Sequence, residues 1–137
     1  MDFNKVNEQL TVSSQITPEE VSVLADKGYT TLVCNRPDME IDDDQSSDAM
    51  AAAAEAAGLS FHYLPVIPGQ FTPELISEMA QVMEESAGPV YAYCRSGTRS
   101  TTLWALSQAG QKAPEEILKE AAGAGYDLSG IAGYLAG

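Results

Sequence analysis

Hydrophobic and polar residues alternate along this chain between strand-like and helix-like patterns. Short runs rich in β-branched or aromatic residues predict buried strands, and apolar residues at helical spacing predict helices. The expected strands cover residues 10–13, 29–34, 59–66 and 89–93. The expected helices cover residues 17–27 and 48–57, begin near residues 72, 99 and 114, and include a short last helix capped by Asp127.

Helix boundaries are marked by residues that favour helix starts and stops. Thr17-Pro18-Glu19-Glu20 and Thr72-Pro73-Glu74 each place a threonine before a proline and acidic residues, which is typical of a helix N-terminus. Gly28 and Gly58 are expected to end helices. The alternation of strands and helices predicts an α/β fold with three layers, a mainly parallel four- to five-stranded sheet flanked by helices. Residues 1–137 are expected to form a single domain, with the glycine-rich segments 123–125 and 130–137 loosely ordered.

Composition narrows the function classes. The 137 residues are 45% hydrophobic and 20% charged, as in an ordinary globular domain. A net charge of −13 argues against partners rich in phosphate, so we expect neither nucleic acid nor a membrane surface as a partner. There is no signal-peptide pattern at the N-terminus and no apolar run of membrane-spanning length, which predicts a cytoplasmic protein. The two cysteines match no metal-binding pattern, and we expect no metal and no cofactor.

The most specific chemical signal is the segment from Cys94 to Ser100, which reads Cys-Arg-Ser-Gly-Thr-Arg-Ser. It follows a buried strand and opens a helix, so backbone N–H groups and the helix N-terminus are expected to form a cradle for an anion. The same groups favour the thiolate, which predicts Cys94 as a nucleophile. Gly97 is expected to supply the positive φ or the close backbone approach that such a turn requires. Arg99 is expected to bind the anion, with the rest of the cradle formed by Arg95, Ser96, Gly97, Thr98 and Ser100.

All three arginines of the chain are expected at this site. Two of them, Arg95 and Arg99, lie in the loop, and Arg36 follows the strand predicted over residues 29–34. The carboxyl ends of parallel strands meet at one edge of a sheet, where ligands bind. Guanidinium groups suit oxyanions better than ammonium groups do, so the sequence predicts a small anion or an anion-bearing group as the substrate.

Two further residues near Arg36 have competing interpretations. Cys34 is first of all a small buried side chain, although its strand ends at the same edge and it could approach Cys94 closely enough to form a disulfide with it. Asp38 lies in an acidic connection between a strand and a helix, and it could supply a proton to a leaving group if it reaches the site.

These residues resemble known families in two ways. The spacing of Cys94 and Arg99 resembles the active-site loop of rhodanese-type sulfurtransferases, whereas the order of elements resembles a dual-specificity phosphatase. Together with Asn35-Arg36-Pro37-Asp38 and Leu64-Pro65-Val66, the chain resembles the phosphatase-like domain of the beta-lactamase-hydrolase-like protein family. That resemblance implies a cysteine-phosphatase-like fold. In that family the domain often precedes a persulfide-oxidising metallo-beta-lactamase-type domain, which this chain lacks and which a separate partner protein could supply.

Two departures from the phosphatase pattern favour sulfur transfer. Cysteine phosphatases have five residues between the cysteine and the arginine, whereas this loop has four, which predicts a narrower cradle. Phosphatases also place an aspartate after the strand that corresponds to residues 61–66, and residues 67–71 contain no carboxylate. A sulfur leaving group has less need of an acid.

The leading hypothesis is therefore a sulfurtransferase that moves sulfane sulfur through a Cys94 persulfide. Its partners would be a small sulfur anion such as thiosulfate and a low-molecular-weight thiol or persulfide. One alternative is a cysteine-dependent phosphatase that acts through a phosphocysteine. The other is an oxyanion-binding or docking module without turnover.

Overall fold

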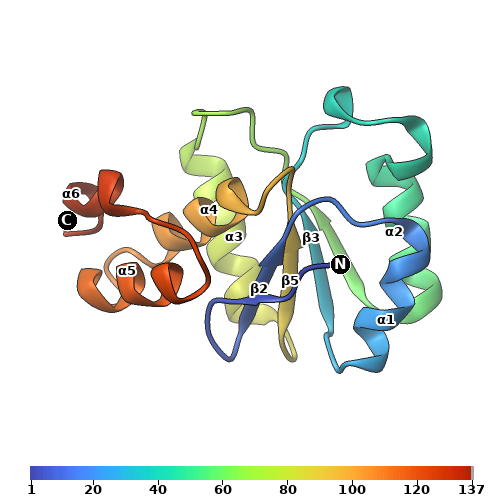
Figure 1. Ribbon diagram of the computed structural model, residues 1–137, viewed down its shortest axis with the longest axis horizontal. Coiled ribbons are helices and arrows are strands. Elements are labelled where there is room, and N and C mark those ends of the chain that lie inside the picture. The colour runs from blue at the N-terminus through green and yellow to red at the C-terminus, as the bar shows by residue number, and fades with distance from the viewer. Residues whose placement is uncertain (137) are drawn as a thin grey trace.

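The computed structural model describes residues 1–136, which form a five-stranded sheet between two layers of helices (Figure 1). The strand order is β1-β2-β5-β3-β4. The strands are β1 (Asn4–Lys5), β2 (Leu10–Ser13), β3 (Thr31–Cys34), β4 (Ser60–Tyr63) and β5 (Val90–Tyr93). Strands β2 to β5 are parallel to one another, and only the short β1 is antiparallel, pairing with β2. The predicted fold class, a mainly parallel sheet flanked by helices, is confirmed.

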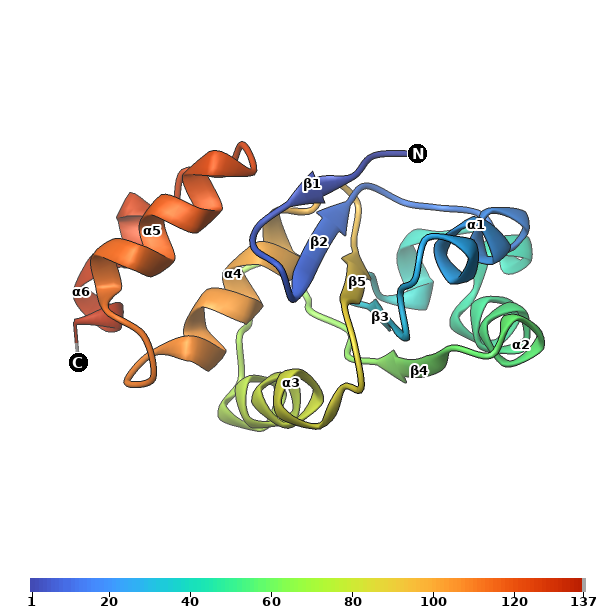
Figure 2. The ribbon, with the colours of Figure 1, turned by 90° about the horizontal axis from the view of Figure 1, so that it is seen from below.

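Helices cover both faces of the sheet. The α-helices are α1 (Val21–Asp26), α2 (Ser47–Ala57), α3 (Pro73–Glu85), α4 (Thr98–Gln108), α5 (Pro114–Gly123) and α6 (Ala132–Leu135). Short 3-10 helices are η1 (Pro18–Glu20), η2 (Asp38–Glu40), η3 (Asp43–Gln45) and η4 (Ser129–Ile131). Figure 2 shows α1 and α2 on one side of the sheet and α3 and α4 on the other, with α5 and α6 beyond α4.

Alternation along the strands explains the two layers. On β3, Leu32 and Cys34 pack toward α1 and α2, whereas Val33 packs toward α3 and α4. On β5, Tyr91 and Tyr93 share the first face. Successive side chains of a strand point to opposite faces, so each apolar strand contributes to both halves of the core.

Several predicted boundaries differ from the structure. The strands expected over 29–34 and 59–66 are shorter, and the helix expected over 17–27 is η1 followed by α1. Strand β1 was not predicted, because two residues carry no detectable alternation. The expectation of loose order for residues 130–137 is wrong up to residue 136: α6 forms there, and the Leu135 side chain is 2% exposed. Gly137 lies outside the described residues.

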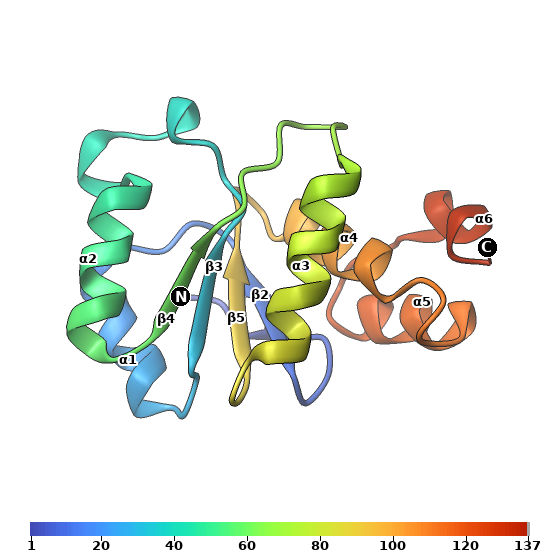
Figure 3. The same cartoon turned by 180° about the vertical axis from the view of Figure 1, so that it is seen from behind.

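The carboxyl ends of the parallel strands open at one edge of the sheet. The connections that follow β3, β4 and β5 all lie at that edge, which is uppermost in Figure 3. They bring together segments that are far apart in the sequence. The fold therefore places the Cys94 loop beside the segments that follow Cys34 and Tyr63.

Candidate active site

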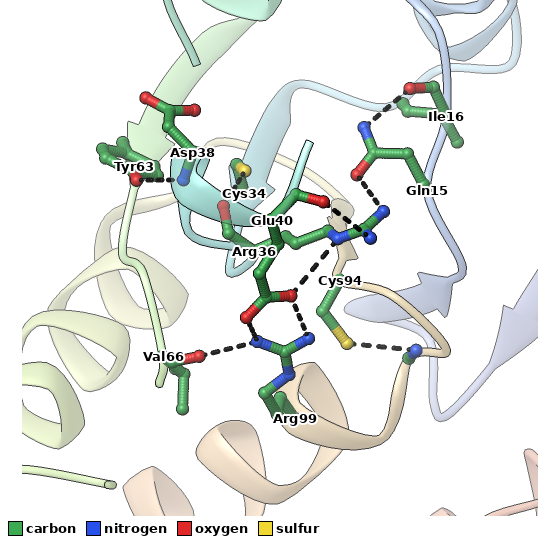
Figure 4. Close-up of polar contacts among 11 residues, drawn as sticks. Gln15, Ile16, Cys34, Arg36, Asp38, Glu40, Tyr63, Val66, Cys94 and Arg99 are labelled. Atoms are coloured by element: carbon green, nitrogen blue, oxygen red, sulfur yellow. Dashed lines mark hydrogen bonds and ion pairs between the residues drawn. The ribbon is translucent and has the colours of Figure 1, made fainter. Parts of the chain in front are cut away.

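Cys94 lies directly after β5 and is fully buried (Figure 4). Its backbone N–H donates to the Ser13 carbonyl at 3.3 Å, which ties the start of the loop to the end of β2. Four residues later α4 begins at Thr98. The thiol is thus held at the N-terminal end of an 11-residue helix, where the helix dipole favours a negative charge.

The sulfur of Cys94 accepts a hydrogen bond from the Gly97 backbone. The N–H of Gly97 lies 3.1 Å from Sγ. Gly97 has a φ of 92°, a conformation that an L side chain rarely adopts. The positive φ expected at Gly97 is observed, and the turn directs a backbone donor at the Cys94 sulfur.

Ser100 adds a buried hydroxyl to the first turn of α4. Its side chain is 0% exposed, and within residues 1–136 its Oγ has no hydrogen-bond partner. A buried hydroxyl without a partner is uncommon in proteins. Ser100 is therefore a buried hydroxyl of the loop whose hydrogen-bonding capacity is not used by residues 1–136.

Arg99 is held in one orientation by three acceptor atoms of Glu40 and Val66. Its Nη1 donates to Glu40 Oε2 at 2.9 Å and to the Val66 carbonyl at 2.8 Å, and its Nη2 donates to Glu40 Oε1 at 2.8 Å. A guanidinium has five N–H donors. These contacts leave one donor on Nη2 and the Nε donor without partners in the described chain, and a planar oxyanion edge fits such a pair.

Glu40 joins two arginines from different segments. Besides Arg99, it contacts Arg36, whose Nε lies 3.3 Å from Glu40 Oε1. Arg36 also donates to the Glu40 carbonyl at 3.2 Å and to Gln15 Oε1 at 3.4 Å. The expected meeting of Arg36 and Arg99 is thus observed, with a carboxylate between them.

These ion pairs shift the ionisation of both partners. The hydrogen bonds from Arg99 are the main reason that the pKa of Glu40 lies below its ordinary value, and Arg36 lowers it further. The same pairing with Glu40 raises the pKa of Arg99. Glu40 is ionised at neutral pH, so it orients the arginines and is not a proton donor there.

Sequence reasoning did not find Glu40. It lies in the acidic connection after β3, where several carboxylates looked equivalent. The signal that could have singled it out is its position four residues after Arg36, a spacing that allows an ion pair in a helical turn.

The Asp38 carboxylate is hydrogen-bonded to the start of α2. Its carboxylate accepts hydrogen bonds from the Ser47 backbone N–H at 2.7 Å and from Ser47 Oγ at 2.6 Å, at the start of α2. Its own N–H donates to the Tyr63 hydroxyl at 3.0 Å. The interpretation of Asp38 as a substitute general acid is not supported by this placement, because the carboxylate stabilises a helix N-terminus.

The remaining predicted residues differ in their surroundings. Cys34 is buried, and its Sγ lies 3.4 Å from the Arg36 carbonyl. Burial is the main cause that raises the pKa of Cys34, and the Tyr93 hydroxyl partly opposes it. Cys34 and Cys94 are both free thiols. Arg95 is exposed at the rim of the loop, as are Ser96 and Thr98, whose hydroxyls lie 3.1 Å apart.

Comparison with known proteins decides the family. Residues 2–111 match the family model of the beta-lactamase hydrolase-like protein, phosphatase-like domain. The chain belongs to this family. The suspected resemblance is therefore confirmed over most of the sequence.

Individual relatives agree with this assignment. The beta-lactamase hydrolase-like protein of Xylella fastidiosa (strain Temecula1) is 33% identical over 130 residues, which are 93% of this chain and 30% of that protein. The chain spans between 24% and 30% of the length of the curated relatives it matches. The crystal structure of a candidate phosphatase from Neisseria meningitidis has a TM-score of 0.80 and 32% identity, covering 96% of this chain and 94% of that one.

A more distant structure shows the fold alone. A candidate phosphatase from Shewanella putrefaciens has a TM-score of 0.71 and 19% identity, covering 95% of this chain and 83% of that one. Within residues 1–136 no helix is both long and apolar enough to cross a membrane. The same residues contain no group of three or more His, Cys, Asp or Glu side chains placed to hold a metal ion.

The leading sequence hypothesis, a rhodanese-like sulfurtransferase, is wrong. The family model and the similar structures are phosphatase-like, and none of them points to sulfur transfer. The hypothesis relied mainly on the number of residues between Cys94 and Arg99. With four residues between Cys94 and Arg99, the loop still directs a backbone N–H at the sulfur, and two donors of Arg99 still have no partner in the described part of the chain.

Proposed function

We propose that this chain is a cysteine-dependent phosphatase that hydrolyses phosphate monoesters through a phosphocysteine at Cys94. The observation that carries the proposal is the pairing of two features at one loop. The Cys94 sulfur accepts the Gly97 N–H at 3.1 Å, and Arg99 at the start of α4 keeps its Nε donor and one Nη2 donor without partners among residues 1–136. Membership of a phosphatase-like family supports the same reading.

The first step is attack of the Cys94 thiolate on phosphorus. The S–P bond forms while the bond from phosphorus to the ester oxygen breaks, and the two free donors of Arg99 hold two of the phosphoryl oxygens. The Glu40 carboxylate keeps the guanidinium oriented. The leaving oxygen takes its proton from water, because residues 67–72 supply no carboxylic acid and Asp38 is bonded to Ser47.

The second step is hydrolysis of the phosphocysteine. Water attacks phosphorus, the S–P bond breaks, and the electron pair returns to the sulfur, giving inorganic phosphate and the free thiolate. The Gly97 N–H stabilises the thiolate as it forms again.

Steady-state turnover of an aryl phosphate tests the proposal. We expect hydrolysis by the wild-type chain, no measurable hydrolysis by Cys94→Ser, and unchanged hydrolysis by Cys34→Ser. Because serine is a far weaker nucleophile at neutral pH, the loss should be complete while the fold is retained. Equal turnover by the wild type and Cys94→Ser would contradict the proposal.

A second candidate is oxyanion binding without turnover. It is favoured by one observation, the absence of a carboxylate in the loop after β4, at residues 67–72. The same preparations distinguish the two functions. Vanadate binding with no turnover of any aryl phosphate would favour a binding module.

A further inference from the structure

Tyr126 connects the C-terminal part of the chain to the Cys94 loop. Its hydroxyl donates to the Ser96 carbonyl at 2.9 Å and accepts a hydrogen bond from Asn4 Nδ2 at 3.1 Å. Tyr126 follows α5 and lies beyond residues 2–111, the part that matches the family model. Burial raises the pKa of Tyr126, so its hydroxyl keeps its proton and remains a donor at neutral pH.

The contact with Ser96 fixes the peptide group that faces the nucleophile. The Ser96 carbonyl and the Gly97 N–H belong to the same peptide plane. No peptide bond within the described residues is cis, and in a trans peptide the carbonyl and the N–H point in opposite directions. Because Tyr126 holds the carbonyl on the outer side of the loop, the N–H is directed inward at Cys94 Sγ, 3.1 Å away.

The Tyr126 ring also packs against the Cys94 loop at Gly97. A Cβ built on Gly97 would overlap the Tyr126 hydroxyl and come within 2.9 Å of its Cζ. The Tyr126 ring therefore lies in contact with the turn. If the Ser96–Gly97 peptide rotated by half a turn, the bond to Tyr126 would be lost and the carbonyl dipole would face the thiolate. Both changes disfavour the rotated peptide.

We propose that Tyr126 is a positioning residue that holds the Ser96–Gly97 peptide with its N–H toward the Cys94 thiolate. Asn4 takes part by donating to the same hydroxyl, which leaves the hydroxyl hydrogen for Ser96. Tyr126 touches neither the sulfur nor the substrate in this role. The inference deepens the proposed phosphatase function, but the thiolate it concerns can be measured without any substrate.

The experiment compares Tyr126→Phe with the control variant Tyr134→Phe. Tyr134 is on the same C-terminal segment and is 56% exposed. The rate of Cys94 alkylation by iodoacetamide is measured against pH, with the Cys94 peptide quantified separately from the Cys34 peptide. Loss of the hydroxyl should raise the pH midpoint of alkylation by about one unit, which corresponds to about tenfold less thiolate below the midpoint. The profile of Tyr134→Phe should match the wild type.

Aryl phosphate kinetics supply an independent readout. Tyr126→Phe is expected to lower kcat/KM about tenfold, mainly through kcat, because the thiolate rather than the Arg99 site is affected. Asn4→Ala should shift the midpoint of alkylation in the same direction by a smaller amount. If Tyr126→Phe does not fold, Asn4→Ala provides the test of the proposal. A midpoint unchanged in every folded variant would overturn the proposal. A shifted midpoint in a chain that turns over no phosphate ester would instead refute the phosphatase function and leave the role of Tyr126 intact.

Discussion

Replacing Gly97 with alanine tests whether the Cys94 loop can accommodate a side chain at this position. Gly97 has a φ of 92°, and a Cβ there would overlap the Tyr126 hydroxyl. Gly110 is a matched control, because its φ is 85° and a Cβ there would meet nothing within 4 Å. Gly110→Ala therefore reports backbone strain alone, whereas Gly97→Ala adds overpacking against Tyr126.

The expected losses in stability follow from backbone strain, overpacking and one lost hydrogen bond. A left-handed conformation costs an L residue about 1–2 kcal/mol. Overpacking adds about 1–3 kcal/mol, and the lost hydrogen bond from Tyr126 to Ser96 adds about 1 kcal/mol. Gly97→Ala should therefore lose roughly 4 kcal/mol in the free energy of unfolding, compared with roughly 1.5 kcal/mol for Gly110→Ala. With an unfolding entropy of roughly 2.1 cal/mol/K per residue, these losses lower Tm by about 14 °C and about 5 °C.

Circular dichroism melts of both variants measure the difference. Cys94 alkylation is followed in parallel below each Tm, where both variants are folded. Gly97→Ala is expected to react more slowly at neutral pH than the wild type, because the Gly97 N–H no longer faces the sulfur, whereas Gly110→Ala should react like the wild type. Equal Tm losses in the two variants, or wild-type alkylation in Gly97→Ala, would refute the reasoning.

Three further predictions concern Glu40, Asp38 and the protonation of the leaving group. Glu40→Gln should destabilise the chain at neutral pH. Because the pKa of Glu40 is lowered in the folded state, the stability contributed by its charge is present above the ordinary pKa near 4.5 and is lost as the pH falls through the folded value. Chemical denaturation should therefore find a smaller difference from the wild type at pH 3 than at pH 7. Asp38→Asn should lower the free energy of unfolding by about 1 kcal/mol, because it weakens the N-terminus of α2, and should leave kcat/KM unchanged. A large loss of kcat/KM at unchanged Tm would instead show that Asp38 is a catalytic acid. A general acid contributes about 10²–10⁴ in rate, so without one alkyl phosphates should be hydrolysed at least about 100-fold more slowly than aryl phosphates. A kcat/KM that does not depend on the leaving group would reveal an acid that we have not identified.

The sequence predicted the sheet and the nucleophile loop because both depend on local patterns. Short runs rich in β-branched or aromatic residues marked the four parallel strands, and a cysteine after a strand and before a helix marked the thiolate cradle. The parallel topology then placed Arg36 and Arg99 at one edge. The boundaries were less accurate, since tertiary contacts decide where a strand ends.

Two parts of the site depend on contacts that no local pattern encodes. Glu40 meets Arg99 across 59 positions of sequence, and Tyr126 meets Ser96 across 30. The function was mispredicted for a related reason. Counting the residues between Cys94 and Arg99 suggested a narrower cradle, but the orientation of the arginine is set by Glu40 and Val66, which lie outside the loop.

Rapid-quench mass spectrometry of the Cys94 peptide tests the central claim most directly. The wild-type chain is mixed with an aryl phosphate and quenched in acid within the first turnover. The proposed mechanism predicts that the peptide containing Cys94 gains the mass of one phosphoryl group and that the peptide containing Cys34 does not. Release of inorganic phosphate with no phosphoryl group on Cys94 at any time, and with turnover retained in Cys94→Ser, would contradict it.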